Sequence, residues 1–436
     1  MEQHRYQETV AQTALRWLYS ILLVLAAPLA YLSLLKRGVR KQRHDSRHFL
    51  SRFGCVARPE QTGGYFFHCV SVGEVVAASC LIRQIMQHEP TAAISISTTT
   101  PTGSARVRAI FGKTVHHFYL PFDFPFSMRW MLSRIRPKAV CITEVELWPN
   151  LIHACWKKQI PVMVVNARMT DRSAKRYGKL RGLFLPMLKK LSCVCAQGMR
   201  DYNNYLHLGM PEGNLVLTNN IKFDQAVSLG DELNAEFNNL DRSTRFIIVA
   251  GSTHAPEEQT LIAAIDQLQP GPSTGSPLLF LVPRHPERFD EVADLLASKH
   301  KRFVRTSTNE ACDDETEVVL LDEMGRLNEA YSCANVAFVG GSLADRGGHN
   351  ALEPAAFGIP IMMGPHTYNN PVICEYLESS GALHVVGNTA EITRCIQRWI
   401  DRPAEASEAG QAAKQVLAEN SGALDKTLYC LQKITN

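Results

Sequence analysis

Short apolar runs alternate with longer stretches of helical spacing along most of this 436-residue chain. Runs of this kind, bounded by polar or glycine-containing turns, are typical of buried strands. In the first half of the chain they occupy residues 65–70, 93–97, 139–142, 162–165 and 194–196. In the second half they occupy residues 246–250, 278–282, 318–321 and 336–339. This alternation of strands and helices predicts parallel sheets with helices on both faces.

The alternation is interrupted by a polar segment that runs from Asp224 to Thr244. A chain of 436 residues is also longer than one ordinary hydrophobic core supports. We therefore expect two α/β domains of comparable size, over residues 46–225 and 245–436, with a linker between them. The segment 270–277 is rich in proline, glycine and serine, and we expect it to form a surface loop of the second domain.

An uncharged stretch from Trp17 to Leu35 precedes the first domain. As a helix it would be about 28 Å long, close to the thickness of the hydrocarbon core of a bilayer. The basic residues around it lie mainly on its C-terminal side, at Lys36, Arg37, Arg40, Lys41, Arg43 and Arg47. This asymmetry predicts an uncleaved membrane anchor with its basic flank over residues 1–45, and cytoplasmic domains after it. An interfacial helix is the alternative, because the run is short and contains Pro28.

Composition and charge restrict the functional classes only slightly. The net charge of +4 is too small to indicate a nucleic acid partner by itself. The 12 cysteines show no C-x-x-C pair and no zinc-finger spacing, which fits reduced thiols in a cytosolic compartment. Cys193 and Cys195 alternate within an apolar run, and we expect them on opposite faces of a strand rather than as metal ligands.

The most informative motif is the stretch 340–365, which reads GGSLADRGGHNALEPAAFGIPIMMGP. It follows the strand-like run 336–339 and leads into a helical segment that opens at Asn350 and Glu353. Glycine lets a phosphate approach the backbone closely, and the N–H groups at a helix start attract anions. The motif therefore predicts a site for a nucleotide or nucleotide sugar. The alternative is a plain helix start with Asn350 as N-cap.

Candidate chemical groups also follow other predicted strands. Glu74 opens the helix after the first strand, where a carboxylate can serve as a general base. An ordinary acid in the first turn of a helix is the alternative. Arg284 follows the strand 278–282, and a guanidinium at that position can bind phosphate, whereas a solvated loop is the alternative. Ser252 and Thr253 follow the strand 246–250, at a turn that could either reach a phosphate or only cap the next helix.

Two further groups occur in the first domain. Glu144 and Glu146 alternate at the end of a strand, so we expect only one of them to face a site, and for Glu146 we favour a structural role. Arg168 begins a basic run that continues to Arg181 with Tyr177 interleaved. Because no nucleic-acid motif is present and an anchor is expected, a phosphorylated lipid is the better candidate for an anionic partner.

Taken in order and spacing, the motifs of this chain resemble those of the 3-deoxy-D-manno-octulosonic acid (Kdo) transferases of Gram-negative bacteria. Enzymes of this family move Kdo from CMP-Kdo onto the lipid A precursor. The resemblance covers almost the whole chain after the first dozen residues. The strings that carry it are SVGE at 71–74, TTTPTGS at 98–104, EVELWPN at 144–150, NAR at 166–168, IKFD at 221–224, GSTH at 251–254, PRHPER at 283–288 and GGSLADRGGHNALEP at 340–354.

The resemblance implies an α/β glycosyltransferase of the GT-B class, with two facing Rossmann-like domains and an N-terminal membrane-anchor helix. It implies an inverting transfer to the lipid A precursor (lipid IVA) at the cytoplasmic face of the inner membrane, with no cofactor and no metal in the site. Anionic lipids of the inner membrane are the other expected partner, and nucleic acid is not expected.

The resemblance also implies roles for individual residues. Glu74 matches the general base of the family, and Glu353 matches a carboxylate that binds ribose. The expected contacts of the nucleotide sugar are Ser252, Thr253, Arg284, His285, Gly341, Ser342, Gly347, Gly348, Asn350 and Glu353. The expected contacts of the acceptor are Thr100, Thr102, Glu144 and Arg168.

The sequence leaves two other functions as alternatives. A GT-B-like nucleotide-sugar epimerase would share the second domain's site, but it has no need of an anchor or a basic face. A membrane-bound, nucleotide-binding regulator without catalytic activity is the second alternative, and the intact surroundings of Glu74 argue against it. The same motifs would serve enzymes that add one or several Kdo residues.

Overall fold

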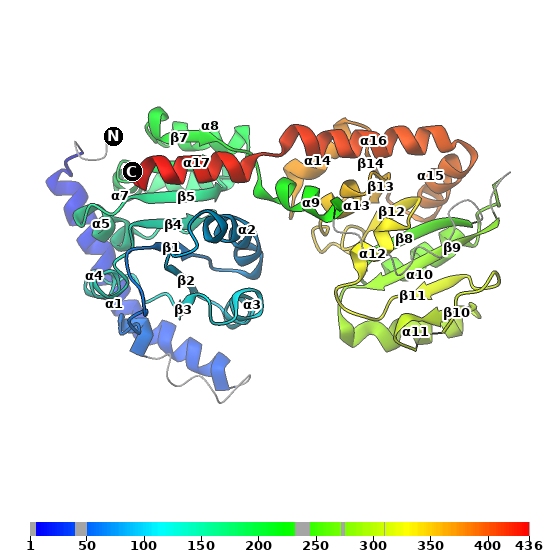
Figure 1. The fold of residues 1–436 in the computed structure, drawn as a ribbon, viewed down its shortest axis with the longest axis horizontal. Coiled ribbons are helices and arrows are strands. Elements are labelled where there is room, and N and C mark those ends of the chain that lie inside the picture. The colour runs from blue at the N-terminus through cyan, green and yellow to red at the C-terminus, as the bar shows by residue number, and fades with distance from the viewer. Residues whose placement is uncertain (1–5, 40–49, 232–244, 272–274, 309, 436) are drawn as a thin grey trace. The chain divides into compact units, whose positions relative to one another are not determined.

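The computed structural model describes residues 6–39, 50–231, 245–271, 275–308 and 310–435, with the backbone alone described at 29–39, 50 and 228–231. The chain divides into two compact units, which we treat separately. Unit 1 comprises Met1–Ile221 and Gly422–Asn436, and unit 2 comprises Lys222–Ser421. Each unit contains a seven-stranded parallel sheet. Figure 1 shows the helices packed around each sheet.

The sheet of unit 1 has the order β3-β2-β1-β4-β5-β6-β7. Its chain begins in the middle at β1, runs outward to β3 and then returns to the other side of β1 at β4. A topological switch point therefore lies between β1 and β4, where ligands of such sheets usually bind. The strands are β1 Tyr65–His68, β2 Ile94–Thr98, β3 His116–Tyr119, β4 Ala139–Thr143, β5 Val162–Ala167, β6 Cys193–Ala196 and β7 Leu215–Leu217.

Helices cover both faces of this sheet, as the strand–helix alternation predicts. Successive residues of β1 point to opposite faces, so Phe66 packs in one core with Met128 and Leu151, while Phe67 packs in the other with Leu81. The helices of unit 1 are α1 Val10–Val39, α2 Val72–His88, α3 Pro101–Phe111, α4 Pro125–Ile135, α5 Pro149–Lys157, α6 Asp171–Lys179, α7 Arg181–Leu188, α8 Met199–His207 and α17 Ala423–Thr435, with short 3-10 turns at Leu50–Phe53 and Glu212–Asn214.

Helix α17 returns to unit 1 after the chain has passed through the whole of unit 2 (Figure 1). Leu428 and Leu431 of α17 belong to the same core as Leu81 of α2. At the surface, Gln84 Nε2 donates a hydrogen bond to Asp425 Oδ1 at 3.2 Å. The expected second domain of 245–436 is therefore wrong at its C-terminal end, because the apolar face of α17 is buried on the sheet of unit 1.

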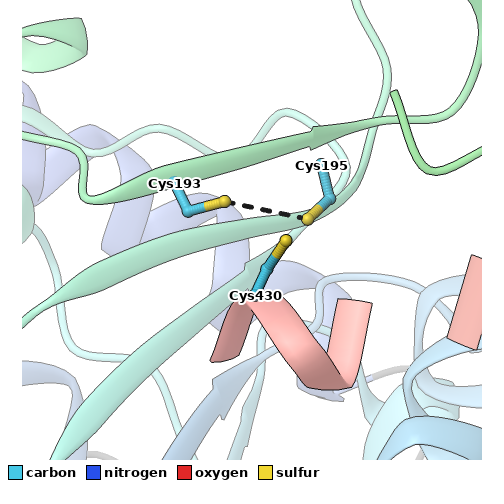
Figure 2. A group of neighbouring side chains, drawn as sticks. All are labelled: Cys193, Cys195 and Cys430. Carbon is cyan, nitrogen blue, oxygen red and sulfur yellow. Dashed lines mark hydrogen bonds between the residues drawn. The ribbon is translucent and has the colours of Figure 1, made fainter. Parts of the chain in front are cut away.

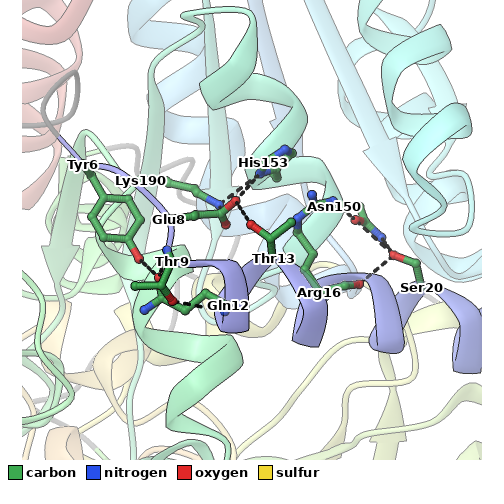
Figure 3. Close-up of polar contacts among 10 residues, drawn as sticks. All are labelled: Tyr6, Glu8, Thr9, Gln12, Thr13, Arg16, Ser20, Asn150, His153 and Lys190. Carbon is green, nitrogen blue, oxygen red and sulfur yellow. Dashed lines mark hydrogen bonds and ion pairs between the residues drawn. The ribbon is translucent and has the colours of Figure 1, made fainter.

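Helix α1 is joined to the body of unit 1 by buried polar contacts (Figure 3). Arg16 Nη1 donates to Asn150 Oδ1 at 3.2 Å, and Asn150 Nδ2 donates to Ser20 Oγ at 2.9 Å. Just before the helix, Glu8 forms an ion pair with the buried Lys190. Residues 8–20 therefore form part of the folded unit, on a face made by α5 and the end of α7.

The other side of α1 is apolar and exposed. Leu18, Ile21 and Leu25 are 51%, 55% and 69% exposed. The segment Val10–Pro28 is long and apolar enough to cross a membrane by length and composition alone. The observed helix starts seven residues before the expected stretch at Trp17, since Thr9 and Gln12 exchange hydrogen bonds that cap its first turn.

Unit 2 has a sheet of order β10-β11-β9-β8-β12-β13-β14. Its chain starts at β8, passes outward through β9 to β10 and β11, and returns next to β8 as β12. The switch point of this sheet therefore lies between β8 and β12. The strands are β8 Arg245–Thr253, β9 Gly275–Pro283, β10 Phe303–Arg305, β11 Val318–Leu320, β12 Val336–Val339, β13 Ile361–Met363 and β14 Leu383–Val385.

The helices of unit 2 begin with α9, which occupies the first part of the segment expected to be a linker. Its residues Phe223 and Ala226 pack in a core of unit 2 with Leu352 and Leu417. Residues 232–244 of the expected linker lie outside the described residues. The helices are α9 Ile221–Asp231, α10 Glu257–Ile265, α11 Phe289–Ser298, α12 Leu327–Ser332, α13 Leu352–Ala356, α14 Pro371–Ser379, α15 Thr389–Asp401 and α16 Pro403–Asn420, with 3-10 turns at Pro286–Arg288 and Thr306–Thr308.

Candidate functional site

The candidate residues of unit 1 follow the carboxyl ends of β1, β2, β4 and β5. Glu74 comes after β1 and Glu144 directly after β4, the two strands that flank the switch point. Thr100 follows β2 and Arg168 follows β5. Because all strands are parallel, these segments lie together at the carboxyl end of the sheet.

Glu74 is held in one orientation by backbone and side-chain donors. Its Oε2 accepts hydrogen bonds from Val70 N at 2.8 Å and Thr143 Oγ1 at 2.9 Å, and its Oε1 accepts one from Ser71 N at 3.2 Å. Ser71 Oγ in turn accepts from Glu74 N, which completes a capping box at the start of α2. The side chain is 7% exposed, and no ion pair to it occurs among the described residues. The Glu74 carboxylate is therefore part of the cap of α2 and is held in one orientation beside the end of β4.

Two further carboxylates lie near Glu74. Glu144 has a left-handed backbone with φ of 57°, which is uncommon for a residue with a side chain and typical of functional positions. Burial, together with the negative charges of Glu74 and Glu144, raises the pKa of Glu146 to about 7. Glu146 is therefore close enough to influence the other two, although the sequence favoured a purely structural role for it.

The residues expected to bind an acceptor differ in how far the fold already uses them. Thr100 caps α3, since its Oγ1 accepts from Gly103 N and donates to Val70 O, both at 3.1 Å. Thr102 is exposed and Arg168 is half-buried. Thr100 thus joins the loops after β1 and β2, while Thr102 and Arg168 present their side chains nearer the solvent.

In unit 2 the switch point brings Gly340 against the end of β8. A Cβ atom on Gly340 would lie 2.4 Å from Ser252 O, so only glycine fits there. Ser252 has a left-handed φ of 57°, and Thr253 next to it is buried with a hydroxyl that has no hydrogen-bond partner among the described residues. The loop after β12 is therefore in direct backbone contact with the last residues of β8, so Ser252 and Thr253 end this strand and do not follow it as expected.

The backbone N–H groups of the glycine-rich loop bind a carboxylate of the protein itself. Glu257, fully buried at the start of α10, accepts from Gly341 N at 2.8 Å and from Ser342 N at 3.0 Å. Leu343 N and Ala344 N also donate to it, at 2.9 and 3.2 Å. The expectation that Gly341 and Ser342 offer these groups to a phosphate is wrong, because Glu257 already occupies them.

A cluster of cationic and imidazole groups lies beside this loop. His254 Nε2 lies 2.9 Å from His349 Nε2, and the two rings are stacked. The ring of His285 meets that of His254 edge-on with centroids 5.3 Å apart. Burial, together with the positive charge of Arg284, lowers the pKa of His349 to about 4. Arg284 and His285 are exposed, so this cluster offers positive charge and imidazole N–H groups at the carboxyl edge of the sheet.

The remaining residues of the expected nucleotide site border the same cluster. Asn350 Nδ2 donates to Glu353 Oε1 at 3.2 Å, and Asn350 Oδ1 accepts from Leu352 N. Burial raises the pKa of Glu353, against the lowering effects of the Asn350 hydrogen bond and of Arg284. Gly347 and Gly348 both have left-handed φ angles, of 83° and 71°. Asn350 is not the helix N-cap expected as an alternative, because α13 starts at Leu352 with Ala351 at that position.

Comparison with known proteins identifies the family. A family model described as 3-deoxy-D-manno-octulosonic-acid transferase (kdotransferase) matches residues 47–225. A 3-deoxy-D-manno-octulosonic acid transferase from Haemophilus influenzae is 40% identical, over 96% of this chain and 98% of its own length. The chain belongs to the Kdo transferase family. A second transferase of this name, from Bordetella pertussis, is 30% identical over 96% of this chain and 99% of its own length.

Solved structures show that this Kdo transferase has the GT-B fold. A putative UDP-N-acetylglucosamine 2-epimerase from Listeria monocytogenes aligns with a TM-score of 0.59 at 12% identity, over 86% of this chain and 96% of that one. MurG from Acinetobacter baumannii aligns with a TM-score of 0.56 at 13% identity, over 85% of this chain and 99% of that one. The expected fold class is therefore confirmed, and membership of the family makes the protein a glycosyltransferase.

Three residues of the Kdo transferase that sequence reasoning left without a role are central to the geometry of unit 2. They are His254, Glu257 and His349. His254 and Glu257 are three residues apart after a strand, and His349 follows a glycine pair, which is a weak signal in each case. Their convergence depends on contacts across more than 80 positions, which no local pattern contains.

Proposed function

We propose that this Kdo transferase moves Kdo from CMP-Kdo to the lipid A precursor (lipid IVA) by an inverting displacement, with Glu74 as the general base. The observation that carries this proposal is the fixed carboxylate of Glu74 at the switch point of unit 1. A base must be held within hydrogen-bond reach of the hydroxyl that it deprotonates, and the capping box holds the Glu74 carboxylate in a fixed position. Membership of the Kdo transferase family supports the donor and the reaction.

The proposed step balances as a single displacement. The acceptor hydroxyl gives its proton to Glu74, and its oxygen forms a bond to the anomeric carbon of Kdo. The bond from that carbon to the phosphate of CMP breaks at the same time, so the configuration at the carbon inverts. The negative charge gathers on the departing phosphate, where positive groups stabilise it.

The donor lies in unit 2 according to this proposal. Arg284 and His285 are exposed cationic or imidazole groups at the carboxyl end of β9, suited to the phosphate of CMP. Glu353 accepts hydrogen bonds from the ribose hydroxyls. We place it there and not beside the phosphate, because two negative charges would repel each other. The left-handed glycines Gly347 and Gly348 allow the nucleotide to approach the backbone beside Asn350. Ser252 and Thr253 line the neighbouring loop.

The acceptor lies in unit 1 according to this proposal. Thr102 and Arg168 are the side chains nearest the solvent, and Arg168 provides a charge for the phosphates of the lipid. Thr100 follows β2 and Glu144 follows β4, the two strands beside β1, and both residues orient sugar hydroxyls near Glu74. The absence of a required metal or cofactor is part of the proposal.

We place the protein at the cytoplasmic face of the inner membrane, with α1 lying along the membrane surface and not across it. Residues 8–20 of this region are bound to unit 1 through Arg16, Ser20 and Asn150, so this part of the helix cannot be surrounded by lipid. Its exposed apolar side, with Leu18 and Leu25, suits the headgroup boundary. Anionic lipids interact with the basic residues after the helix.

The test combines purified full-length protein, CMP-Kdo and lipid IVA, and detects Kdo on the lipid by mass spectrometry. Glu74→Gln keeps a side chain that can complete the capping box, and we expect transfer to fall by about 10²- to 10⁴-fold, the usual contribution of a general base. CMP-Kdo affinity should stay within twofold. Glu89→Gln, at the C-terminal end of the same helix α2, is the matched control and should retain transfer.

Two results would count against the proposal. If the native protein binds CMP-Kdo and yet places no Kdo on the lipid, the transfer itself is refuted. If Glu74→Gln transfers within tenfold of the native rate, the reaction stands but Glu74 is not its base. The mass of the product also gives the number of Kdo residues added.

A further inference from the structure

Three buried thiols meet between strand β6 and helix α17, as Figure 2 shows. Cys193 and Cys195 project from β6, and Cys430 projects from α17. The three Sγ atoms all lie within 4.8 Å of one another, with Cys193 and Cys195 Sγ 3.9 Å apart. Alternate residues of a strand share a face, so the expectation that Cys193 and Cys195 lie on opposite faces is wrong.

A cavity of about 570 Å³ opens beside two of these thiols. It is lined by Cys193 and Cys430 together with Lys426, Tyr429 and Lys433 of α17. Cys193 is the first residue of β6, so the cavity lies toward the amino ends of the strands, away from the edge that carries Glu74. A small ion can therefore reach the sulfur atoms without entering the candidate acceptor site.

The spacing of the sulfur atoms fits a common metal ion. Zinc–thiolate bonds are about 2.3 Å long, so three sulfurs around one ion lie roughly 3.8 to 4.0 Å apart. Thiolate ligands without oxygen donors favour soft cations over magnesium, calcium or manganese. Within the described part of the chain, this is also the one place where three such ligand atoms converge.

We propose that Cys193, Cys195 and Cys430 bind one thiophilic d10 metal ion, such as Zn²⁺ or Cu⁺, with the cavity leaving room for a fourth ligand. Binding replaces the three thiol protons, which pass to solvent. Apolar packing alone needs only volume and does not require three sulfurs beside an open cavity.

The proposed site has a structural consequence. The ion would tie Cys430 of α17 to two residues of β6, so that the helix that returns from unit 2 is cross-linked to the sheet of unit 1. Metal binding should therefore slow the opening of α17 relative to the rest of the unit, because a ligand that binds only the folded arrangement stabilises it.

The test uses the full-length protein, reduced and stripped of metal, under nitrogen, with Cd²⁺ alone as the probe. Thiolate-to-cadmium charge transfer reports the number of bound sulfurs by ultraviolet absorption, in competition with a chelator of known affinity. We expect one tight equivalent, and at least a hundredfold weaker binding in Cys430→Ser, which preserves the size of the side chain. Cys155→Ser, at a buried thiol in the other core of unit 1, is the matched control and should keep the tight equivalent.

Hydrogen exchange provides a second readout. Cd²⁺ should slow exchange in residues 423–435 of the native protein and of Cys155→Ser, and leave Cys430→Ser unchanged. Equal cadmium affinity of the native protein and Cys430→Ser would overturn the proposal. So would a reduced native protein that binds no cadmium tightly but readily forms a disulfide between Cys430 and a β6 cysteine, since the cluster would then be a thiol pair and not a metal site.

Discussion

The buried carboxylate of Glu257 lies 2.8 Å from the backbone nitrogen of Gly341, although 84 positions separate the two residues along the chain. Through this contact the start of α10 fixes the loop that follows β12. The loop has the composition of a phosphate-binding loop, yet several of its backbone N–H groups already donate hydrogen bonds to Glu257. Glu257 thus determines the shape of the loop on which the proposed nucleotide contacts are mounted.

Replacing Glu257 should disrupt this loop. Glu257→Ala leaves several buried N–H groups without an acceptor, and we expect a loss of about 3 kcal/mol or more in the free energy of unfolding. Glu257→Gln retains one acceptor oxygen, so its free energy of unfolding should fall by less. Urea unfolding measures both, and CMP affinity should fall in the same order. Glu291→Gln, a change at an exposed residue that is 61% accessible, is the control; an equal effect there would contradict this role of Glu257.

The close approach of Gly340 to the end of β8 gives a steric prediction. In Gly340→Ala the new Cβ would meet Ser252 O at 2.4 Å, an atom that cannot move without displacing β8. We expect a destabilisation of about 1 to 3 kcal/mol, the usual cost of overpacking, and weaker CMP binding. Gly178→Ala in α6, where a Cβ would meet nothing within 4 Å, should be neutral or slightly stabilising by thermal unfolding. Similar melting temperatures for both variants would show that the approach is not tight.

The pKa of Glu146 gives a pH-dependent prediction. Burial and the carboxylates Glu74 and Glu144 raise this pKa to about 7 from the ordinary 4.5. The folded state therefore holds the proton more tightly than the unfolded state, and the native protein loses stability as the pH rises from about 4.5 to 7. Glu146→Gln does not ionise, so its advantage over the native protein should grow through this range, to about 1 to 2 kcal/mol at pH 8 after allowance for partial exposure.

Urea unfolding at pH 5 and pH 8 tests this expectation. Glu89→Gln is the control, because a hydrogen bond from Lys138 lowers the pKa of Glu89 and its titration therefore lies below this range. The stability difference between Glu89→Gln and the native protein should be the same at both pH values. If the difference for Glu146→Gln is also constant, Glu146 does not titrate where its surroundings indicate.

The position of α1 can be tested by labelling from one side of the membrane. Gln7 is exposed and precedes the docked residues 8–20, so a helix bound to unit 1 keeps it on the same side as that unit. An impermeant maleimide should label Gln7→Cys in inverted vesicles and leave it unlabelled in intact spheroplasts, relative to the native protein. Glu212→Cys, at an exposed site of unit 1, should behave identically. Labelling of Gln7→Cys in spheroplasts would show that α1 crosses the membrane.

The alternation of apolar runs and helical spacing was sufficient to predict two parallel α/β sheets and their central strands. It missed β3, β7, β10, β13 and β14, each of three or four residues, because such short runs carry little periodic signal. In β3 the half-buried His116 and His117 also interrupt the apolar pattern. The return of α17 to unit 1 was also missed, because its apolar stripe specifies burial but not the partner.

The candidate site could be proposed from the sequence where a residue lies soon after a predicted strand, as with Glu74 and Arg284, and the roles of these residues stay predictions. It was not predictable where one residue is used by another far away in sequence. The sequence cannot reveal that Glu257 occupies the amides of Gly341 and Ser342, because a glycine-rich loop has the same composition whether its donors bind a ligand or a carboxylate of the protein.

The return of α17 also affects the order of events during synthesis. A domain made first on the ribosome can usually fold before the next one emerges. Unit 1 departs from this rule, since residues 423–435 are translated only after the whole of unit 2. Until then the face of β6 that holds Cys193 and Cys195 lacks its covering helix, and the nascent sheet presents bare thiols and apolar side chains to the cytosol. Unit 1 therefore completes its fold only after unit 2 has been synthesised.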